Sequence, residues 1–278
     1  MLTLFDKTSF GCSRLITKAY STSFTLGIQT LDNRFHDAIY GIYGYVRFAD
    51  EIVDTFHDHD KKALLARFRE DTVRAIDEKI SLNPVLHAFQ LVVNQYHIEW
   101  DLIDSFLKSM EMDLQYDRYE TSMYDAYIYG SAEVVGLMCL RVFCEGNDAE
   151  YDRLKASAKS LGSAFQKVNF LRDMKSDYTE RGRVYFPGMN FATFDEEAKK
   201  QVEANIQADF DEAYKGIMEL PKGAKMGVYL AYIYYISLFN KIKQSAAEVV
   251  KSERIRVSDR RKIGLLVKTY VKSSLNIL

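Results

Sequence analysis

The stretch FQKVNFLRDMKSD, residues 165–177, predicts a helix with one polar face. Steps of three, four and four residues separate the polar positions Gln166, Asn169, Asp173 and Asp177. Positions four apart on an α-helix project within about 40° of each other and lie about 6 Å apart along the axis. The carboxylates of Asp173 and Asp177 can therefore bind one hard cation together, or lie on either side of two, with the oxygen ligands that Mg²⁺ requires.

A second acidic pair lies in YGYVRFADEIVD, residues 43–54. Tyr43, Arg47, Asp50 and Asp54 are separated by four, three and four residues, so they also share one helix face. A single acidic pair with this spacing is most often part of a solvated surface, but such surfaces are rich in Lys and Glu. These two faces carry Asn, Gln, Tyr, Arg and Asp instead, which favours a polar site that faces inward.

The composition is that of an ordinary globular protein. The chain has 278 residues, of which 47% are hydrophobic and 27% charged, and its formal net charge is −2. A chain of this length buries a substantial core, and a nearly neutral chain gives no reason to expect nucleic acid as a partner.

The cysteines and the spread of apolar residues bear on location. Cys12, Cys139 and Cys144 are odd in number and lack CxxC spacing, so neither a disulfide framework nor a structural zinc site is expected. The first residues do not combine basic side chains with an apolar run, and no uncharged apolar run of about 18 residues occurs. We expect a cytoplasmic protein that does not span a membrane.

Sparse prolines and long helical periodicity predict an all-α fold. The prolines Pro84, Pro187 and Pro221 each fall where a helical pattern stops or starts. The periodicity predicts helices over 6–20, 34–56, 60–80, 84–96, 100–116, 122–145, 148–178, 195–219, 223–252 and 258–275. No linker or repeat interrupts them, so residues 1–278 are expected to form one domain. The longest segment between them, 178–194, follows the second acidic pair and is expected to be functional, for example as a flap over a substrate.

Aromatic residues gather in two of the predicted helices. Residues 119–143 combine aromatic and small side chains, and residues 228–239 add four tyrosines, within a chain that has 19 Tyr and 17 Phe. Ordinary core packing explains any one of these residues. Together they also suit an aromatic-lined tunnel, because aromatic faces stabilise a carbocation without offering it a nucleophile.

Six blocks of sequence extend these observations. They are YSTSF (20–24), YGYVRFADEIVD (43–54), MEMDLQYDRYET (110–121), YIYGSAEVVGLM (127–138), FQKVNFLRDMKSDYTERGRVYFP (165–187) and ERIRVSDRRK (253–262). In this order, and spanning nearly the whole chain, they resemble the phytoene synthase branch of the squalene and phytoene synthase family.

The resemblance implies a single-domain, all-α isoprenoid synthase fold with a central cavity and the two acidic motifs facing each other near its mouth. It also implies Mg²⁺-dependent head-to-head condensation of two geranylgeranyl diphosphates, through prephytoene diphosphate, to phytoene. Mn²⁺ is an alternative ion, and no nicotinamide cofactor is expected. Two alternatives stay open: a related enzyme that uses farnesyl diphosphate to make squalene, dehydrosqualene or presqualene diphosphate, and a noncatalytic binding partner.

The resemblance further implies roles for individual residues. Asp50, Asp54, Asp173 and Asp177 are the expected metal ligands, with Asn169 as an additional ligand and Gln166 hydrogen-bonding nearby. Diphosphate and substrate contacts are expected from Arg47, Arg172, Arg254, Ser21, Ser23 and Phe24. Tyr43, Tyr129 and one of Tyr232, Tyr234 or Tyr235 are expected near the reacting carbons. A structural ion pair is an alternative role for Arg172.

Other positions carry open alternatives. Asp113 either binds a cation or holds neighbouring helices together, and Glu133 stands where relatives commonly have glycine, facing either the tunnel or the outside. Glu51 lies off the ligand stripe and is expected to matter little. The string His57–Asp60 is expected to be a solvated loop. The basic run Lys251–Lys262 is expected to be a solvated helix end that also contributes Arg254 to the diphosphate site, and contact with anionic lipid heads is an alternative.

A product without polar groups must reach a bilayer. Peripheral membrane contact is therefore expected, through the apolar residues Phe186, Met189, Phe191 and Phe194 of the 186–194 loop.

Overall fold

The computed structural model describes residues 3–115, 121–181, 185–186, 191, 193–258, 261 and 264–269. These residues form helices and contain no β-strand, which confirms the all-α prediction. The helices are α1 (Leu4–Tyr20), α2 (Thr22–Gln29), α3 (Asn33–Asp54), α4 (Lys61–Glu78), α5 (Pro84–Tyr96), α6 (Trp100–Asp113), α7 (Thr121–Ile128), the π-helical segment η1 (Tyr129–Glu133), α8 (Val134–Cys144), α9 (Asp148–Arg181), α10 (Glu196–Glu219), α11 (Lys222–Lys243) and α12 (Ala247–Ser252).

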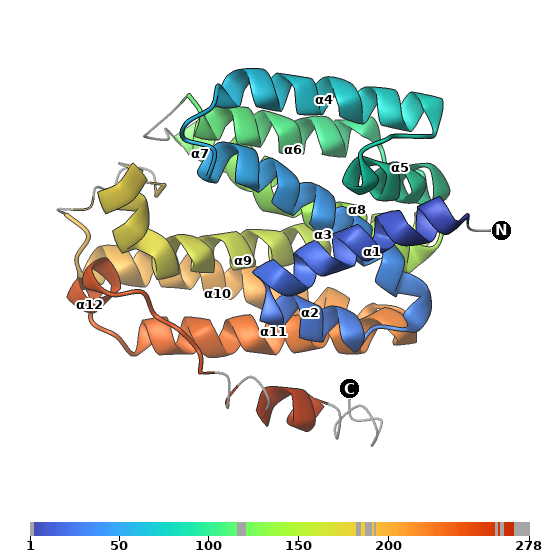
Figure 1. Cartoon of the computed structure of the whole chain (residues 1–278). Helices are drawn as coiled ribbons and strands as arrows, with labels where there is room; N and C mark the ends of the chain where they lie inside the picture. The colour runs from blue at the N-terminus through green and yellow to red at the C-terminus, as the bar shows by residue number, and fades with distance from the viewer. Residues whose placement is uncertain are drawn as a thin grey trace.

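The helices pack as one bundle around the long helix α9. Figure 1 shows α9, α10 and α11 side by side along one side of the molecule, with α4 and α6 on the opposite side. Helix α3 lies between these two groups and contacts α1, α5 and α8. The acidic pair of α3 and that of α9 therefore both lie on inner helices of the bundle.

Two clusters of buried side chains hold the bundle together. The first joins α3 to α4, α5, α6 and α8, and at its centre the ring of Tyr45 stacks on Phe89, with ring centroids 3.8 Å apart. The second joins α9, α10, α11 and α12 and includes Phe210 and Phe239, both fully buried. Each buried aromatic ring removes a large apolar area from water, which stabilises the fold.

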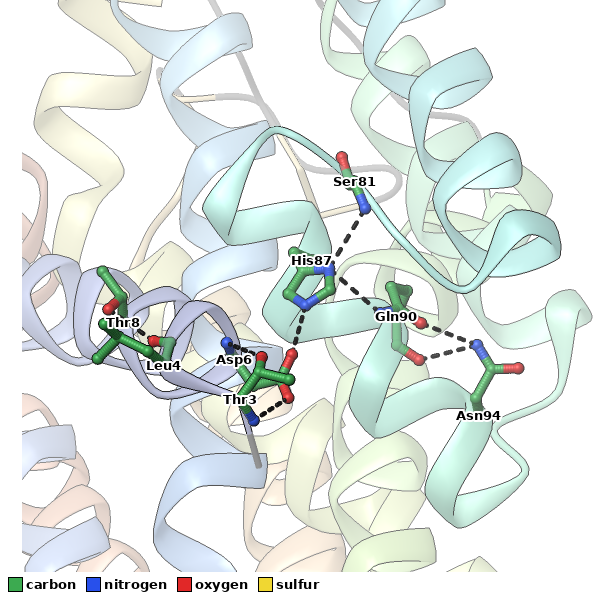
Figure 2. A network of polar contacts seen from close by, with 8 residues as sticks. All are labelled: Thr3, Leu4, Asp6, Thr8, Ser81, His87, Gln90 and Asn94. Atoms are coloured by element: carbon green, nitrogen blue, oxygen red, sulfur yellow. Dashed lines mark hydrogen bonds and ion pairs between the residues drawn. The ribbon is translucent and has the colours of Figure 1, made fainter. Parts of the chain in front are cut away.

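Helix α1 is held at its start by the polar network that Figure 2 shows. Thr3 accepts a hydrogen bond from the backbone of Asp6, and the Asp6 carboxylate accepts one from the backbone of Thr3, so the two form a capping box. The same carboxylate lies 2.8 Å from Nε2 of the buried His87 on α5. The network continues through Gln90 to Asn94, so the start of α1 is fixed to α5.

Several predicted helix boundaries were wrong. Helix α2 was not predicted: Ser21 adopts an extended conformation after α1, and its hydroxyl then caps a new helix by accepting a hydrogen bond from the backbone of Phe24. The predicted helix 223–252 is two helices, because α11 ends at Lys243 and α12 begins at Ala247. Helix α9 runs three residues beyond its predicted end to Arg181. Residues 264–269 are helical, and the rest of the predicted helix 258–275 lies largely outside the described residues.

The predicted helix 122–145 contains a π-helical segment, η1. The reason is a close contact at Gly130, because a Cβ atom there would lie 2.7 Å from Cβ of Ser109 on α6. The extra residue in the wider turn lets the backbone pass this contact. In the described part of the chain, the stretch Met123–Cys144 is long and apolar enough to cross a membrane, but 56% of its most apolar window is buried inside the bundle.

Candidate active site

A cavity of about 370 Å³ runs between the inner helices of the bundle. Most of its wall comes from six helices and η1. Along α3, α9 and α11 the lining residues change from polar to apolar in the same direction. The polar end is formed by Tyr43, Arg47, Asp50, Gln166, Asn169 and Tyr235. The apolar end is formed by Leu31, Ile39, Phe143, Leu154, Ile217 and Leu220. The cavity therefore suits a long apolar molecule with a charged head.

The length of the cavity follows from the geometry of α9. This helix contributes lining residues from Leu154 at the apolar end to Asn169 at the polar end. At 1.5 Å per residue, that run covers about 22 Å of wall. Small side chains, among them Ala158 and Gly162, line its middle and leave the space between the helices open.

The carboxylate of Asp50 lies at the polar end of the cavity, next to other acidic groups. Burial raises its pKa to about 7, and the charges of Asp54 and Asp113 raise it further while Arg47 opposes them. Nη1 of Arg47 lies 3.8 Å from an Asp50 oxygen. The negative charges of three neighbouring carboxylates repel one another, so this end of the cavity favours a bound cation.

Arg47 itself is held by residues that the sequence analysis did not emphasise. Its Nη2 donates a hydrogen bond to Glu51 on the next turn of α3, and its guanidinium lies 4.3 Å from the ring centroid of Tyr20. Burial opposes ionisation of Glu51, but hydrogen bonds from Arg47, Thr55 and Tyr20 lower its pKa. The role of Glu51 stays a prediction, and the structure places its carboxylate on Arg47, four residues earlier on the same helix.

The second acidic pair lies on α9 across the cavity from the first. Nε of Arg254 forms an ion pair with an Asp173 oxygen at 2.7 Å, and Arg172 donates a hydrogen bond to the same carboxylate from Nε over 3.0 Å. Burial opposes the charge on Arg172, but the hydrogen bond to Asp173 raises its pKa. The structural ion pair that was an alternative for Arg172 is therefore present. Asp177, one turn further along, is buried.

The tyrosines connect the two sides of the site. Tyr235 donates a hydrogen bond from its hydroxyl to Oδ1 of Asn169 over 3.2 Å. Tyr43 hydrogen-bonds to Ser21, and burial raises its pKa to about 12, with a further contribution from Tyr235. Of the three tyrosines on α11 that were alternatives, Tyr235 is the one at the cavity. Tyr232 packs near Phe210 instead.

The expected position of Tyr129 was wrong. It does not appear in the described cavity wall, and its ring lies 5.2 Å from the ammonium group of Lys159 on α9. Two residues earlier, the buried Tyr127 donates a hydrogen bond to Asp113 over 3.0 Å. Asp113 therefore holds α6 to α7 and also contributes charge near Asp50. Tyr127, like Tyr129, is not among the residues that line the described cavity, and it belongs to the second buried cluster.

The remaining predicted residues divide between the site and other places. Phe24 lines the cavity, and Ser23 lines a small hollow next to it together with Tyr234 and Tyr235. Gln166 lines the polar end, as noted above. Glu133 points away from the cavity and pairs with Lys159 at 3.2 Å, with burial raising its pKa.

Two polar segments behave as ordinary surface. His57 is exposed and lies 3.0 Å from Nζ of Lys61, and Asp60 caps α4, as a solvated loop would. Of the basic run Lys251–Lys262, Arg254 contacts Asp173, whereas Lys251 pairs with Glu248.

The apolar residues that were expected to meet a membrane are largely unavailable. Phe186 and Phe194 are 8% and 2% exposed and belong to the second buried cluster. Phe191 is half-buried and stacks on Tyr178, with ring centroids 4.1 Å apart. Met189 lies outside the described residues.

Carboxylate and amide oxygens at the polar end are the donors that Mg²⁺ prefers, and Asp50 shows the excess of negative charge that a cation would relieve. Within the described residues, no three His, Cys, Asp or Glu side chains already form a compact ligand group. Asp50 of the first pair lines the polar end of the cavity from α3, and Asp173 of the second pair lies on α9, one turn beyond the lining residue Asn169.

An all-helical bundle around an apolar cavity, with acidic and basic side chains at one end, defines a class of protein that binds a long apolar molecule through a charged head. The model of the squalene/phytoene synthase family matches residues 17–261, and the chain belongs to this family, whose members are prenyltransferases.

Individual relatives agree with this assignment. Phytoene synthase 1 of Solanum lycopersicum is 27% identical over 275 residues, which are 91% of this chain and 66% of that protein. The 4,4'-diapophytoene synthase of Staphylococcus haemolyticus is 26% identical over 202 residues, which are 70% of this chain and 67% of that protein. A crystal structure of a dehydrosqualene synthase with a ligand superposes with a TM-score of 0.80 at 22% identity, covering 96% of this chain and 98% of that one. It shows that the fold is shared.

Proposed function

We propose that the protein condenses two molecules of geranylgeranyl diphosphate head to head, through prephytoene diphosphate, to phytoene, and releases diphosphate. This reaction would serve carotenoid biosynthesis. The observation that carries the proposal is the cavity, which joins an apolar wall of about 22 Å to a polar end lined by Arg47, Asp50 and Asn169. A prenyl chain fits the first part and a diphosphate with its cations fits the second.

Mg²⁺ is the proposed cofactor, with Mn²⁺ as an alternative. Asp50, Asp54, Asp173 and Asp177 would hold it, with Asn169 as a further oxygen ligand. When bound, it would supply the positive charge that neutralises a departing diphosphate.

The chain's own side chains would complete the diphosphate site. Arg47, Arg172 and Arg254 offer guanidinium groups, which match phosphate oxygens in shape and charge. The hydroxyls of Ser21 and Ser23 would donate further hydrogen bonds. Because Arg172 and Arg254 both contact Asp173 in this structure, they lie within reach of the same end of the cavity.

The tyrosines would act on the prenyl carbons. Burial raises the pKa of Tyr43, so its hydroxyl keeps its proton at neutral pH and can donate a hydrogen bond to an oxygen that is leaving. Its ring and that of Tyr235 face the cavity, where an aromatic surface stabilises positive charge on carbon. The apolar wall beyond them would exclude water from that charge.

A second candidate substrate is farnesyl diphosphate, which would give squalene, dehydrosqualene or presqualene diphosphate. The names of the relatives support it, because they include a 4,4'-diapophytoene synthase as well as phytoene synthases. The two candidates share the polar end of the cavity and differ in how much of the apolar end the chain fills.

Product analysis tests the proposal directly. The purified protein is supplied with geranylgeranyl or farnesyl diphosphate and Mg²⁺, with and without a nicotinamide cofactor, and the products are identified by mass. We expect phytoene from geranylgeranyl diphosphate, independent of the nicotinamide. Product from farnesyl diphosphate alone would establish the second candidate, and no product from either would reject both.

We also propose that the protein is cytoplasmic and contacts a bilayer peripherally, since the product carries no polar group. The exposed ring of Tyr178, stacked on Phe191, is the aromatic surface in the described part of the 178–194 region that supports this contact. Sedimentation with liposomes of neutral and anionic lipid tests it. Binding should weaken in Tyr178→Ser, and a protein that stays in the supernatant with both lipids would contradict the proposal.

A further inference from the structure

The guanidinium of Arg47 is fixed on three sides at the polar end of the cavity. Its Nη2 donates to Glu51, one turn along α3, and its Nη1 lies 3.8 Å from Asp50. The ring of Tyr20, from the end of α1, covers its face at 4.3 Å. A flexible side chain held in this way loses little further freedom when a ligand binds.

Glu51 is the strongest of these contacts. Its carboxylate accepts a direct hydrogen bond from Arg47, whereas the oxygen of Asp50 lies beyond hydrogen-bond distance. The side chains of Arg47 and Glu51 are 23% and 15% exposed, so water competes weakly for either group. A charge-assisted hydrogen bond in such surroundings is stronger than one on an open surface.

One donor of Arg47 is left without a protein acceptor. Within the part of the chain that the structure describes, Nε is buried and makes no hydrogen bond. Arg47 also lines the cavity. A buried donor without a partner is costly unless a ligand supplies an acceptor, so the arrangement indicates a site for an oxygen of a bound molecule.

We propose that Glu51 is a positioning residue that holds Nη2 of Arg47, with Tyr20 as a brace, so that Nε is presented to a diphosphate oxygen in the cavity. This inference rests on the proposed function, because the diphosphate is the ligand of that function. Glu51 itself does not touch the substrate, and its effect on binding passes through Arg47.

A double-mutant cycle tests this coupling. The affinity for inorganic pyrophosphate in the presence of Mg²⁺ is measured by calorimetry for the wild type, Glu51→Gln, Arg47→Lys and the double variant. We expect Glu51→Gln to weaken binding about tenfold, the effect of losing one charge-assisted hydrogen bond. In the Arg47→Lys background the same substitution should change binding by less than about twofold, because the group that Glu51 positions is gone.

The sign of the change in pyrophosphate affinity distinguishes a positioning role of Glu51 from a direct effect of its negative charge. Removing a negative charge near an anion site strengthens anion binding when the charge acts alone. Tighter binding by Glu51→Gln, an unchanged affinity, or an equal loss in both backgrounds would each overturn the proposal. Glu51→Asp should retain most of the affinity, because it keeps a carboxylate one turn from Arg47.

One further variant serves as a control. Glu219→Gln removes an ion pair of Arg153 far from the polar end, where both side chains are about half exposed, and should leave pyrophosphate binding unchanged. Two variants test the brace: Tyr20→Phe keeps the ring over Arg47 but loses the hydroxyl that hydrogen-bonds Glu51, and Tyr20→Ala loses both, so binding should weaken in the first and further in the second. Melting temperatures of all variants report whether the fold is intact.

The proposed function and this inference fail in different ways. A wild-type protein that does not bind pyrophosphate with Mg²⁺ would refute the diphosphate site and, with it, the ligand assigned to Arg47. A wild-type protein that binds, with a Glu51→Gln variant that binds equally well, would refute only the positioning role. Steady-state kinetics distinguish the two in a second way, because weaker positioning of a binding group raises KM more than it lowers kcat.

Discussion

At the scale of single residues, the acidic side chains at the polar end carry the first prediction. Asp50→Asn or Asp173→Asn should abolish condensation, because each removes a charged ligand that the proposed Mg²⁺ requires. The fold should survive, since both side chains line the cavity or contact solvent and neither belongs to the buried clusters. Product formation and circular dichroism check the two statements. Full activity in either variant would remove that residue from the ligand set.

Asp50 also predicts a pH dependence of stability in the metal-free protein. Its pKa is about 7 in the folded chain and 3.8 when unperturbed, so the unfolded state binds fewer protons between these values. The stability that protonated Asp50 contributes is therefore present below pH 3.8 and lost as the pH rises through about 7. Asp50→Asn, which stays neutral, should melt at the same temperature as the wild type near pH 4 and higher at pH 8.

The expected difference at pH 8 is about 1 kcal/mol, well below the full pKa shift, because solvent screens a partly exposed group. For a domain of this size it corresponds to about 2–4 °C in Tm. Melting curves without metal at both pH values measure it, and Mg²⁺ should then stabilise the wild type more than the variant. A variant that is less stable than the wild type at pH 8 would contradict the burial of an unbalanced charge.

Helical spacing identified some of the residues at the cavity and not others. Tyr43, Arg47 and Asp50 share a cavity face because α3 is a regular helix, so counting steps of three and four identified them. Spacing predicted Tyr129 at the cavity, but the described wall does not include it, and no local pattern in the sequence predicts the wider turn of η1. Contacts between helices, such as that of Tyr20 with Arg47, have no sequence signal at all.

At the scale of elements, the packing of η1 against α6 depends on a missing side chain. A Cβ at position 130 would lie 2.7 Å from Cβ of Ser109 and would also meet the backbone carbonyl of Ser105. Backbone cannot move aside cheaply, so Gly130→Ala should destabilise the protein by about 1–3 kcal/mol. Denaturant unfolding measures this change.

A matched control lies on α1. Gly11 is also in a helix, but a Cβ there would meet nothing within 4 Å. Gly11→Ala should therefore stabilise the protein by about 0.5–1 kcal/mol through helix propensity. Equal effects of the two substitutions would show that the contact at η1 is not as tight as the structure has it.

The capping box of α1 predicts a pH dependence of stability opposite to that of Asp50. Hydrogen bonds from His87 and from the backbone of Thr3 lower the pKa of Asp6 below 3.8, as Figure 2 illustrates. A lowered pKa contributes stability that is present above pH 3.8 and lost as the pH falls through the folded value. Asp6→Asn should cost about 1 kcal/mol at pH 7, and the difference should shrink below pH 4. Paired melting curves at pH 3 and 7 test this, and a constant difference would contradict it.

The sequence predicted the long helices but not every short one. Long amphipathic stretches such as α9 and α10 were correct in type and position, because their periodicity extends over many turns. Helix α2 was missed, since eight residues give too few turns for a pattern and its start depends on the cap at Ser21. The cap also brings Ser21 to Tyr43, which lines the cavity.

At the scale of the whole molecule, the cavity exists only because helices far apart in sequence line up. The polar end of α3 meets that of α9 and α11, and the apolar ends meet likewise. The cavity is therefore graded by polarity along one axis, from Arg47 and Asp50 at one end to apolar side chains at the other. Spacing within one helix predicts neither the depth nor the width of such a space, which is why the substrate's chain length could not be predicted from the sequence.

The last prediction tests that depth. Cys139 lines the cavity on α8, beyond the polar end, and burial raises its pKa to about 12, so it is a neutral, small, apolar wall residue. Cys139→Phe should fill part of the apolar end and disfavour the longer prenyl chain. A pocket that is too short by a small apolar group discriminates by about tenfold or more, so the ratio of kcat/KM for geranylgeranyl over farnesyl diphosphate should fall by that factor.

Competition between the two diphosphates, read by product mass, measures the ratio in a single reaction. Cys12→Phe is the control, because Cys12 lies on α1, which contributes no residue to the described cavity wall, and it should leave the ratio unchanged. Cys139→Ala, which adds no volume, should likewise keep the wild-type preference and shows whether loss of the thiol matters. A folded Cys139→Phe variant with an unaltered ratio would mean that prenyl chains do not reach this part of the cavity, since a ring added to the wall of an occupied space must exclude the longer chain first.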